Sequence, residues 1–304
     1  MQPTPLITLH AQQLRHIPLR LLVKRDDLNH PYISGNKWRK LKHNLLQARR
    51  QNRTHLLTLG GAYSNHLAAV AAAGKEYGFL TTGIVRGERT EPLNPTLSFA
   101  SNCGMQFLFT SRGSYATTPP AEWTRLAGLD PDRTFFIPEG GSNCLALPGL
   151  AELVLELNVQ MEQAPYFLCT ACGTGGTLAG IAAALPLHCR ALGIPVLKAD
   201  FMEGAVRELL TACGQASPGN WQVVNGYHFG GYAKFKPGLI DFMNGFKREF
   251  GIPLDPVYTG KLFCAVFDLA EQGFFPPGAN VVLLHSGGLQ GLAGFRERFP
   301  GLLE

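Results

Sequence analysis

The alternation of short apolar strands with alanine-rich helices constrains this sequence more than any other feature. A glycine-rich or polar turn separates several of these segments. Strictly alternating strands and helices imply parallel sheets that helices cover on both faces. The predicted fold class is therefore α/β with two parallel-sheet lobes. Strands are predicted at 55–59, 79–85, 105–110, 135–138, 166–171, 193–199 and 280–284, and helices at 65–77, 95–103, 147–160, 177–185 and 205–213.

The predicted elements divide between two domains. Residues 41–145 form a small domain, and residues 1–40 and 146–304 together form a larger one, because the N-terminal segment crosses back to join the second half. A chain of 304 residues with 45% hydrophobic and 16% charged residues is long and apolar enough for two cores.

Charge and cysteine content indicate the setting in which the protein works. The net charge of +5 is spread over scattered basic residues, which favours small anionic ligands over nucleic acid. The N-terminus lacks a signal-peptide pattern, and no apolar run reaches about 18 residues, so neither secretion nor membrane insertion is expected. Seven cysteines, an odd number, predict reduced thiols in a cytoplasmic protein.

Lys37 is the first candidate catalytic residue. It lies at the start of a predicted helix, two residues after Gly35, which lets the backbone approach another group closely. A desolvated lysine has a lowered pKa and can form a Schiff base with an aldehyde cofactor. The alternative is an ordinary solvated lysine, since Arg39, Lys40 and Lys42 are close in sequence.

Two strand-to-helix turns predict anion-binding sites. Gly173, Thr174, Gly175, Gly176 and Thr177 form a loop whose backbone N–H groups, with the following helix N-terminus, are suited to a phosphate. No lysine follows the last glycine, so this is not a Walker A loop. The second turn runs from 60 to 66, and both turns lie where parallel strands end. Either turn could instead be tight and bind nothing, with Ser64 or Asn65 capping a helix.

Two tyrosines and two cysteines are weaker candidates. Tyr232 follows a glycine-rich stretch and Tyr258 starts a helix, yet each is more often a structural residue. Cys169 and Cys172 form C-x-x-C without a second ligand pair, which predicts buried thiols and no metal site.

Taken together, the segments resemble one enzyme family. The motifs Lys-Arg-Asp-Asp-Leu-Asn, Ser-Gly-Asn-Lys, Gly-Gly-Ala-Tyr-Ser-Asn-His, Glu-Gly-Gly-Ser-Asn, Gly-Thr-Gly-Gly-Thr and Asp-Pro-Val-Tyr-Thr-Gly-Lys occur in this order. This order is similar to that of the D-cysteine desulfhydrases and 1-aminocyclopropane-1-carboxylate (ACC) deaminases, pyridoxal-phosphate enzymes with a tryptophan synthase β-like fold. The resemblance spans nearly the whole chain and implies pyridoxal 5′-phosphate in the larger domain, a small amino-acid substrate and a homodimer.

The resemblance also assigns roles to individual residues. Lys37 matches the Schiff-base lysine, Asn65 the residue that contacts the cofactor's ring hydroxyl, and Ser64 a serine that contacts substrate. The loop from Gly173 to Thr177 matches the phosphate site. Tyr232 and Tyr258 match two active-site tyrosines.

Thr259 falls at the position that contacts the pyridine nitrogen, where the ACC deaminases carry a Glu. A hydroxyl cannot hold a proton on that nitrogen as a carboxylate does, so the ring is a weaker electron sink. A weaker sink suits β-elimination better than opening of a cyclopropane. A second departure is the unusual segment 226–235, which borders the expected substrate position.

The sequence therefore predicts a lyase or deaminase that converts a small amino acid to a keto acid and ammonia by β-elimination. ACC deamination on the same scaffold is the first alternative. A non-catalytic protein that binds pyridoxal phosphate is the second, and a nucleotide-binding protein that uses only the glycine loops is the third.

Overall fold

The larger lobe is built on a six-stranded sheet. The structure is a computed structural model that describes residues 3–162, 164–216 and 219–304. Among these residues β1 pairs antiparallel with β2, and the other neighbouring strands of this sheet are parallel. In spatial order the strands are β1 (Leu6–Leu9), β2 (Arg20–Lys24), β10 (Asn280–Leu284), β7 (Tyr166–Cys172), β8 (Arg190–Pro195) and β9 (Trp221–Val223).

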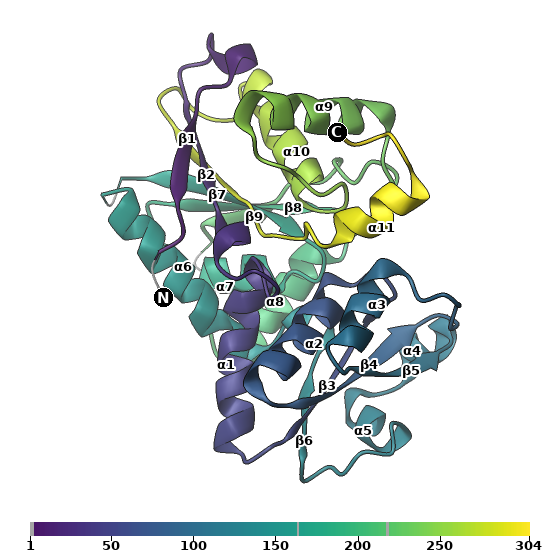
Figure 1. The fold of residues 1–304 in the computed structure, drawn as a ribbon. Coiled ribbons are helices and arrows are strands. Elements are labelled where there is room, and N and C mark those ends of the chain that lie inside the picture. Colours follow the sequence, from purple (N-terminus) through teal and green to yellow (C-terminus); the bar gives the residue numbers. More distant parts are fainter. Residues whose placement is uncertain (1–2, 163, 217–218) are drawn as a thin grey trace.

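Helices cover both faces of this sheet (Figure 1). One group, α9 (Pro237–Phe250) and α10 (Thr259–Glu271), lies on one face, and α6 (Leu147–Gln160), α7 (Gly176–Ala184) and α8 (Met202–Ala212) lie on the other. Each group shares a separate hydrophobic core with the sheet. A last helix, α11 (Gly291–Arg298), contacts the smaller lobe through α3 (Pro95–Asn102).

The smaller lobe contains a four-stranded parallel sheet in the order β5 (Gln106–Thr110), β4 (Leu80–Arg86), β3 (His55–Gly61) and β6 (Thr134–Ile137). The helices α2 (Asn65–Tyr77) and α3 lie on one face, and α4 (Arg112–Thr117) and α5 (Trp123–Leu126) lie on the other (Figure 1). The two-lobed α/β fold class is confirmed. The exact domain boundaries at 40/41 and 145/146 stay a prediction.

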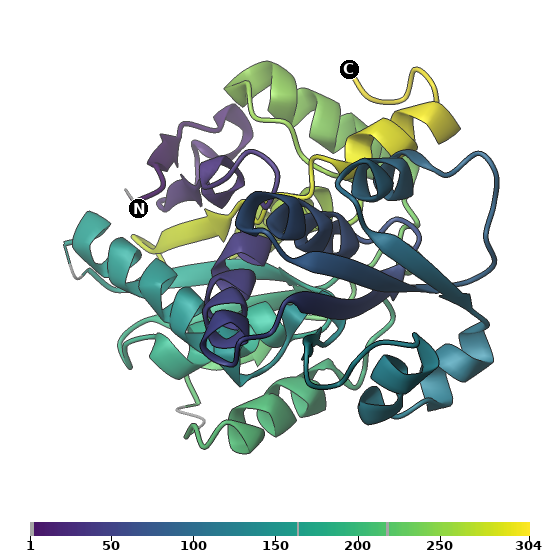
Figure 2. The ribbon, with the colours of Figure 1, turned by 60° about the horizontal axis from the view of Figure 1, so that its bottom comes forward.

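The helix α1 (Asn36–Arg50) runs from the larger lobe into the smaller one, and the described part of the chain begins and ends in the larger lobe (Figures 1 and 2). Buried charges fix α1 to the larger lobe. The Arg39 guanidinium donates to Asp26 at 2.9 Å and to Glu156 of α6 at 2.6 Å. Lys24 also donates to Glu156, at 2.8 Å. Charges buried in this way are tolerated because each has an oppositely charged partner and forms hydrogen bonds.

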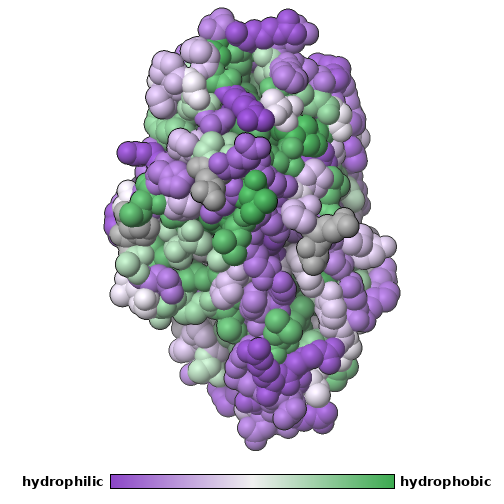
Figure 3. Space-filling model, turned by 90° about the vertical axis from the view of Figure 1, so that its left-hand side faces the viewer, coloured by the Kyte–Doolittle hydropathy of each residue, from purple (hydrophilic) through white to green (hydrophobic). Residues whose placement is uncertain are grey.

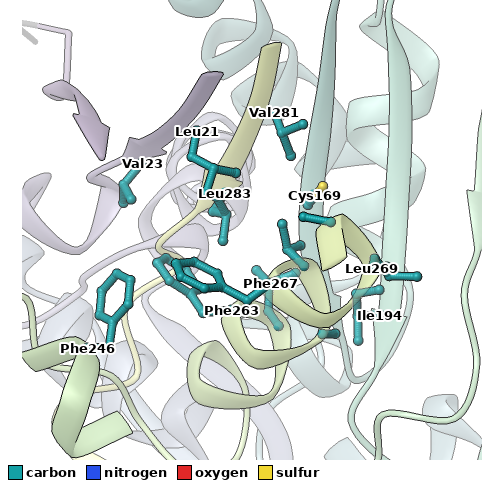
Figure 4. Packing of buried hydrophobic residues seen from close by; sticks show 14 of the residues in the cluster. Leu21, Val23, Cys169, Ile194, Phe246, Phe263, Phe267, Leu269, Val281 and Leu283 are labelled. Atoms are coloured by element: carbon teal, nitrogen blue, oxygen red, sulfur yellow. The ribbon is translucent and has the colours of Figure 1, made fainter. Parts of the chain in front are cut away.

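The core under α9 and α10 is rich in aromatic residues. Phe246 packs against Phe263 and Phe267, with ring centroids 5.1 and 5.9 Å away (Figure 4). Leu21 and Leu283 from the sheet lie in the same cluster. Burial of each such phenyl ring contributes roughly 1.5–3 kcal/mol, so this core anchors the start of α10, where the candidate site residues Tyr258 and Thr259 lie.

Among the described residues, no helix is long and apolar enough to span a bilayer. On the face shown in Figure 3, hydrophobic areas are small and are interrupted by hydrophilic residues.

One strand prediction needs correction, and three strands were not predicted. The strand predicted at 193–199 is β8, which ends at Pro195, because proline has no N–H to continue the hydrogen-bond ladder. The strands β1, β2 and β9 were not predicted. β1 and β9 are short strands at the two edges of the sheet, and β1 gives the larger sheet an antiparallel edge. The predicted helix starts near Lys37, Asn65 and Thr259 are confirmed.

The expectation of reduced thiols is wrong for two of the seven cysteines. Cys144 and Cys213 form a disulfide that joins the turn before α6 to the end of α8. The pair is 69 residues apart in sequence, so no local pattern reveals it. Cys169 and Cys172 are free and buried, as predicted.

Candidate active site

Lys37 lies in the first turn of α1, against the loop that follows β10. The backbone passes so close to this loop that a Cβ atom on Gly35 would lie 1.9 Å from the carbonyl oxygen of Ser286. The Lys37 ammonium donates to the Asn36 side chain at 3.2 Å. Burial lowers the pKa of Lys37 to about 8, although the negative charge of Asp255 opposes this shift. A substantial fraction of the amine is therefore a free nucleophile near neutral pH.

One cavity of about 490 Å³ brings most of the predicted site residues together. A smaller cavity of about 170 Å³ shares four residues with it, so these residues lie between the two spaces: Asn36, Lys37, Asn65 and Tyr258. Thr259 lines neither cavity. The predicted residues that line the larger cavity are Lys37, Ser64, Asn65, Gly173, Thr174, Gly175, Gly176, Thr177, Tyr232 and Tyr258.

The glycine loop connects β7 to α7 and packs tightly against the turn after β6. Gly175 has a φ of +77°, a conformation that favours glycine. A Cβ atom on Gly176 would lie 2.2 Å from the Ser142 hydroxyl oxygen. The Ser142 and Thr174 hydroxyls are 2.6 Å apart. The close packing presents the start of α7 to the cavity, where backbone N–H groups favour an anion.

Lys40 is a functional candidate that the sequence analysis did not assign. Its side chain is almost completely buried and lines the larger cavity. The ammonium donates to Gly140 O at 3.0 Å and to Ser142 at 3.2 Å, and it has no ion pair among the described residues. Burial, together with the charge of Lys37, holds the pKa of Lys40 well below its usual range. An anion bound at the glycine loop would supply the missing charge, so the site fits a phosphate.

The turn before α2 holds Ser64 and Asn65 at the cavity. Ser64 Oγ caps the helix by accepting from the backbone N–H groups of His66 at 3.2 Å and Leu67 at 3.3 Å. The Asn65 side-chain oxygen accepts from Gln290. These contacts leave the Ser64 O–H and the Asn65 NH₂ as donors toward a ligand.

Tyr232 and Tyr258 meet at the cavity from different segments. Their hydroxyl oxygens are 3.2 Å apart and their rings pack edge to face at 6.2 Å. A Cβ atom on Gly173 would lie 3.2 Å from the Tyr258 ring, so Tyr258 also borders the glycine loop. Burial and the neighbouring Tyr232 raise the pKa of Tyr258 well above its usual range. The pair is therefore protonated near neutral pH and can donate.

Thr259 is completely buried, and its hydroxyl is engaged by Asp255. The hydroxyl donates to Asp255 Oδ2 at 2.7 Å and accepts from the Asp255 backbone N–H at 2.8 Å. The same carboxylate accepts from the backbone N–H groups of Val257, Tyr258 and Thr259. Asp255 is the carboxylate whose negative charge raises the pKa of Lys37. The sequence pattern placed Asp255 only in a turn. The contact of Thr259 with a pyridine nitrogen stays a prediction.

Arg86, at the end of β4, is another candidate that no sequence pattern indicated. Its guanidinium lines the larger cavity, lies 5.1 Å from the centre of the Tyr115 ring, and would be 3.6 Å from a Cβ atom on Gly61. It has no ion pair among the described residues. Arg86 therefore adds positive charge beside the Ser64 turn.

Fold and site define a class of protein: a two-lobed α/β enzyme in which a lysine of lowered pKa and a glycine loop face one cavity. The profile of the family described as "Pyridoxal-phosphate dependent enzyme" matches residues 1–287. The chain belongs to this family, and its cofactor is pyridoxal phosphate.

Three relatives show the range of the similarity. A Thermotoga maritima protein provisionally named 1-aminocyclopropane-1-carboxylate deaminase is 30% identical over 96% of each chain. A Klebsiella pneumoniae D-cysteine desulfhydrase is 29% identical over 95% of this chain and 93% of its own. The crystal structure of an ACC deaminase homologue superposes with a TM-score of 0.84 at 28% identity and covers 100% of this chain and 94% of the other.

Proposed function

We propose that this enzyme is a lyase, similar to D-cysteine desulfhydrase, that eliminates a β-substituent from a small amino acid to give a keto acid and ammonia. One observation carries the proposal: the Lys37 amine, the Ser64 turn and the tyrosine pair line a single cavity with the glycine loop. When bound, pyridoxal phosphate supplies the electron sink that makes the substrate's α-proton acidic.

Each residue has a role that its environment supports. The Lys37 amine, with a pKa of about 8, takes the α-proton. The Ser64 hydroxyl and Arg86 bind the substrate carboxylate. As the Cβ–S bond breaks, Tyr258 or Tyr232 donates a proton to the departing sulfide, and water then releases the keto acid and ammonia. Lys40 and the start of α7 hold the phosphate of the cofactor.

ACC deaminase activity is the alternative on the same scaffold. Relatives carry both names at nearly equal identity. We favour β-elimination because Thr259 replaces the carboxylate that keeps the pyridine nitrogen protonated in ACC deaminases. A non-catalytic protein that binds pyridoxal phosphate is the second alternative.

Keto-acid release from D- and L-cysteine, β-chloroalanine and ACC tests the proposal. We expect turnover of D-cysteine or a β-chloroalanine, and little or none of ACC. Greater turnover of ACC than of D-cysteine would favour the first alternative. A cofactor-loaded protein that turns over no amino acid would favour the second.

We further propose that the enzyme is a cytoplasmic homodimer. The resemblance of the sequence motifs to the family supports the homodimer. Light scattering coupled to size-exclusion chromatography tests the assembly, and a mass near 33.0 kDa would indicate a monomer instead of a dimer.

A further inference from the structure

The loop that carries Tyr232 has an unusual backbone. Five of its residues have a positive φ, and two of these, Phe229 at +52° and Ala233 at +54°, are not glycine. Residues with side chains rarely adopt this conformation, and they keep it only where the surroundings hold them there. The five residues are Gly226, Phe229, Gly230, Gly231 and Ala233.

A single buried ammonium group binds the backbone of this loop. Lys261 Nζ donates to three backbone carbonyls: Gly231 at 2.8 Å, His228 at 2.9 Å and Val196 at 3.0 Å. The first two belong to the loop, and the third follows the end of β8. The lysine is 0% exposed and forms no ion pair among the residues that the structure describes. All three N–H groups are thus used to tie the loop to the sheet.

The position of Lys261 links this attachment to the active site. It lies in the first turn of α10, three residues after Tyr258. The loop carbonyl of Gly231 immediately precedes Tyr232, whose hydroxyl is 3.2 Å from that of Tyr258. Loss of the ammonium would free the Tyr232 segment on one side of the cavity while leaving Tyr258 in its helix.

We propose that Lys261 is a positioning residue that fixes Tyr232 against Tyr258 and so determines how tightly the enzyme binds its amino-acid substrate. The inference rests on the proposed function for the role of Tyr232. Lys261 does not itself line the cavity, so it acts through the loop. Burial lowers the pKa of Lys261 to about 8, although the negative charge of Asp255 opposes this shift, so at neutral pH most of the amine is still in the charged form with three donors.

Lys261→Met removes the donors while keeping a side chain of similar length. Lys198→Met is the matched control, because Lys198 is exposed beside the same loop and lines a different small cavity. We expect Lys261→Met to load pyridoxal phosphate on Lys37 normally and to raise KM for D-cysteine about tenfold with a smaller change in kcat. Trypsin should cleave faster after the exposed Lys234 in this variant than in the wild type or in Lys198→Met.

A double-mutant cycle separates positioning from general stabilisation. If Lys261 acts through Tyr232, adding Lys261→Met to a Tyr232→Phe variant should change KM by less than about twofold. The proposal would be overturned if the KM increase in the double variant equalled the product of the increases in the two single variants. It would also be overturned if Lys261→Met kept the KM and the cleavage rate of the wild type. If Lys261→Met does not fold, Lys261→Gln, which keeps fewer donors, is measured in the same way. Wild-type protein without turnover would refute the proposed function, while the cleavage assay would still test the attachment of the loop.

Discussion

At the residue scale, the central feature is a pair of lysines one helical turn apart that face one cavity with different partners. Lys37 lies near the Asp255 carboxylate, whereas Lys40 is surrounded by a carbonyl and a hydroxyl. The first environment leaves a nucleophile with a pKa of about 8, and in the second, burial disfavours the charged form of the amine until an anion binds beside it. The two residues therefore suit the aldehyde and the phosphate of the same cofactor.

The lowered pKa of Lys37 predicts how fast the cofactor-free protein reacts with pyridoxal phosphate. Only the unprotonated amine attacks an aldehyde, so the rate should rise about tenfold per pH unit up to about pH 8 and then level off. Stopped-flow absorbance over pH 6 to 10 measures this rate. A rate that continues to rise toward the ordinary lysine pKa of about 10.4 would contradict the proposed environment of Lys37.

Lys40→Met tests whether Lys40 serves the cofactor or the fold. Loss of a charge-assisted contact with phosphate should weaken cofactor affinity by about ten- to a hundredfold. Because burial lowers the pKa of Lys40, folding opposes its charge, and the cofactor-free variant should be at least as stable as the wild type. Cofactor titration and urea unfolding measure the two quantities. Unchanged affinity with lowered stability would give Lys40 a structural role.

Sequence patterns predicted the site residues that stand in recognisable local segments, such as turns and helix starts. Lys37, Asn65 and the glycine loop stand at turns or helix starts, and the structure brings them to one cavity. Asp255 and Arg86 gave no comparable signal, because their relation to Lys37 and Ser64 arises only from tertiary packing. Lys40 could have been found, since residues three apart on a helix share a face.

At the element scale, α1 depends on the ion network that fixes it to the larger lobe. Arg39→Met leaves the buried Asp26 carboxylate and the partly buried Glu156 carboxylate without their main partner, and should lower the free energy of unfolding by about 3–5 kcal/mol. The exposed Arg50→Met, at the other end of α1, should change it by less than about 0.5 kcal/mol. Urea unfolding of both variants provides the comparison, and equal values would mean that the network adds nothing.

The disulfide between Cys144 and Cys213 stabilises the elements around the glycine loop. Val206 and Met202 of α8 contact the Gly175 position, and Cys213 directly follows this helix. Closing a loop of this length should contribute roughly 3–4 kcal/mol to stability. Dithiothreitol should therefore lower the unfolding midpoint of the wild type but not that of a Cys144→Ser variant. Equal sensitivity of both proteins to the reductant would exclude the disulfide in solution.

At the scale of the whole molecule, the alternation of strands and helices was enough to predict two parallel α/β lobes. It was not enough to predict β1 or β9, because an edge strand of three or four residues has too few positions to establish a pattern. The disulfide was also missed, since it joins segments 69 residues apart. Both kinds of feature depend on tertiary proximity.

The two lobes meet where α1 begins, and this geometry makes Lys37 the expected attachment point of the cofactor. The protein is loaded with pyridoxal phosphate, reduced with borohydride, digested and analysed by tandem mass spectrometry, with Lys37→Ala as the control. We expect a pyridoxyl adduct on Lys37 in the wild type and no adduct in the control. An adduct on Lys24, Lys40 or Lys261 in the wild type would contradict it.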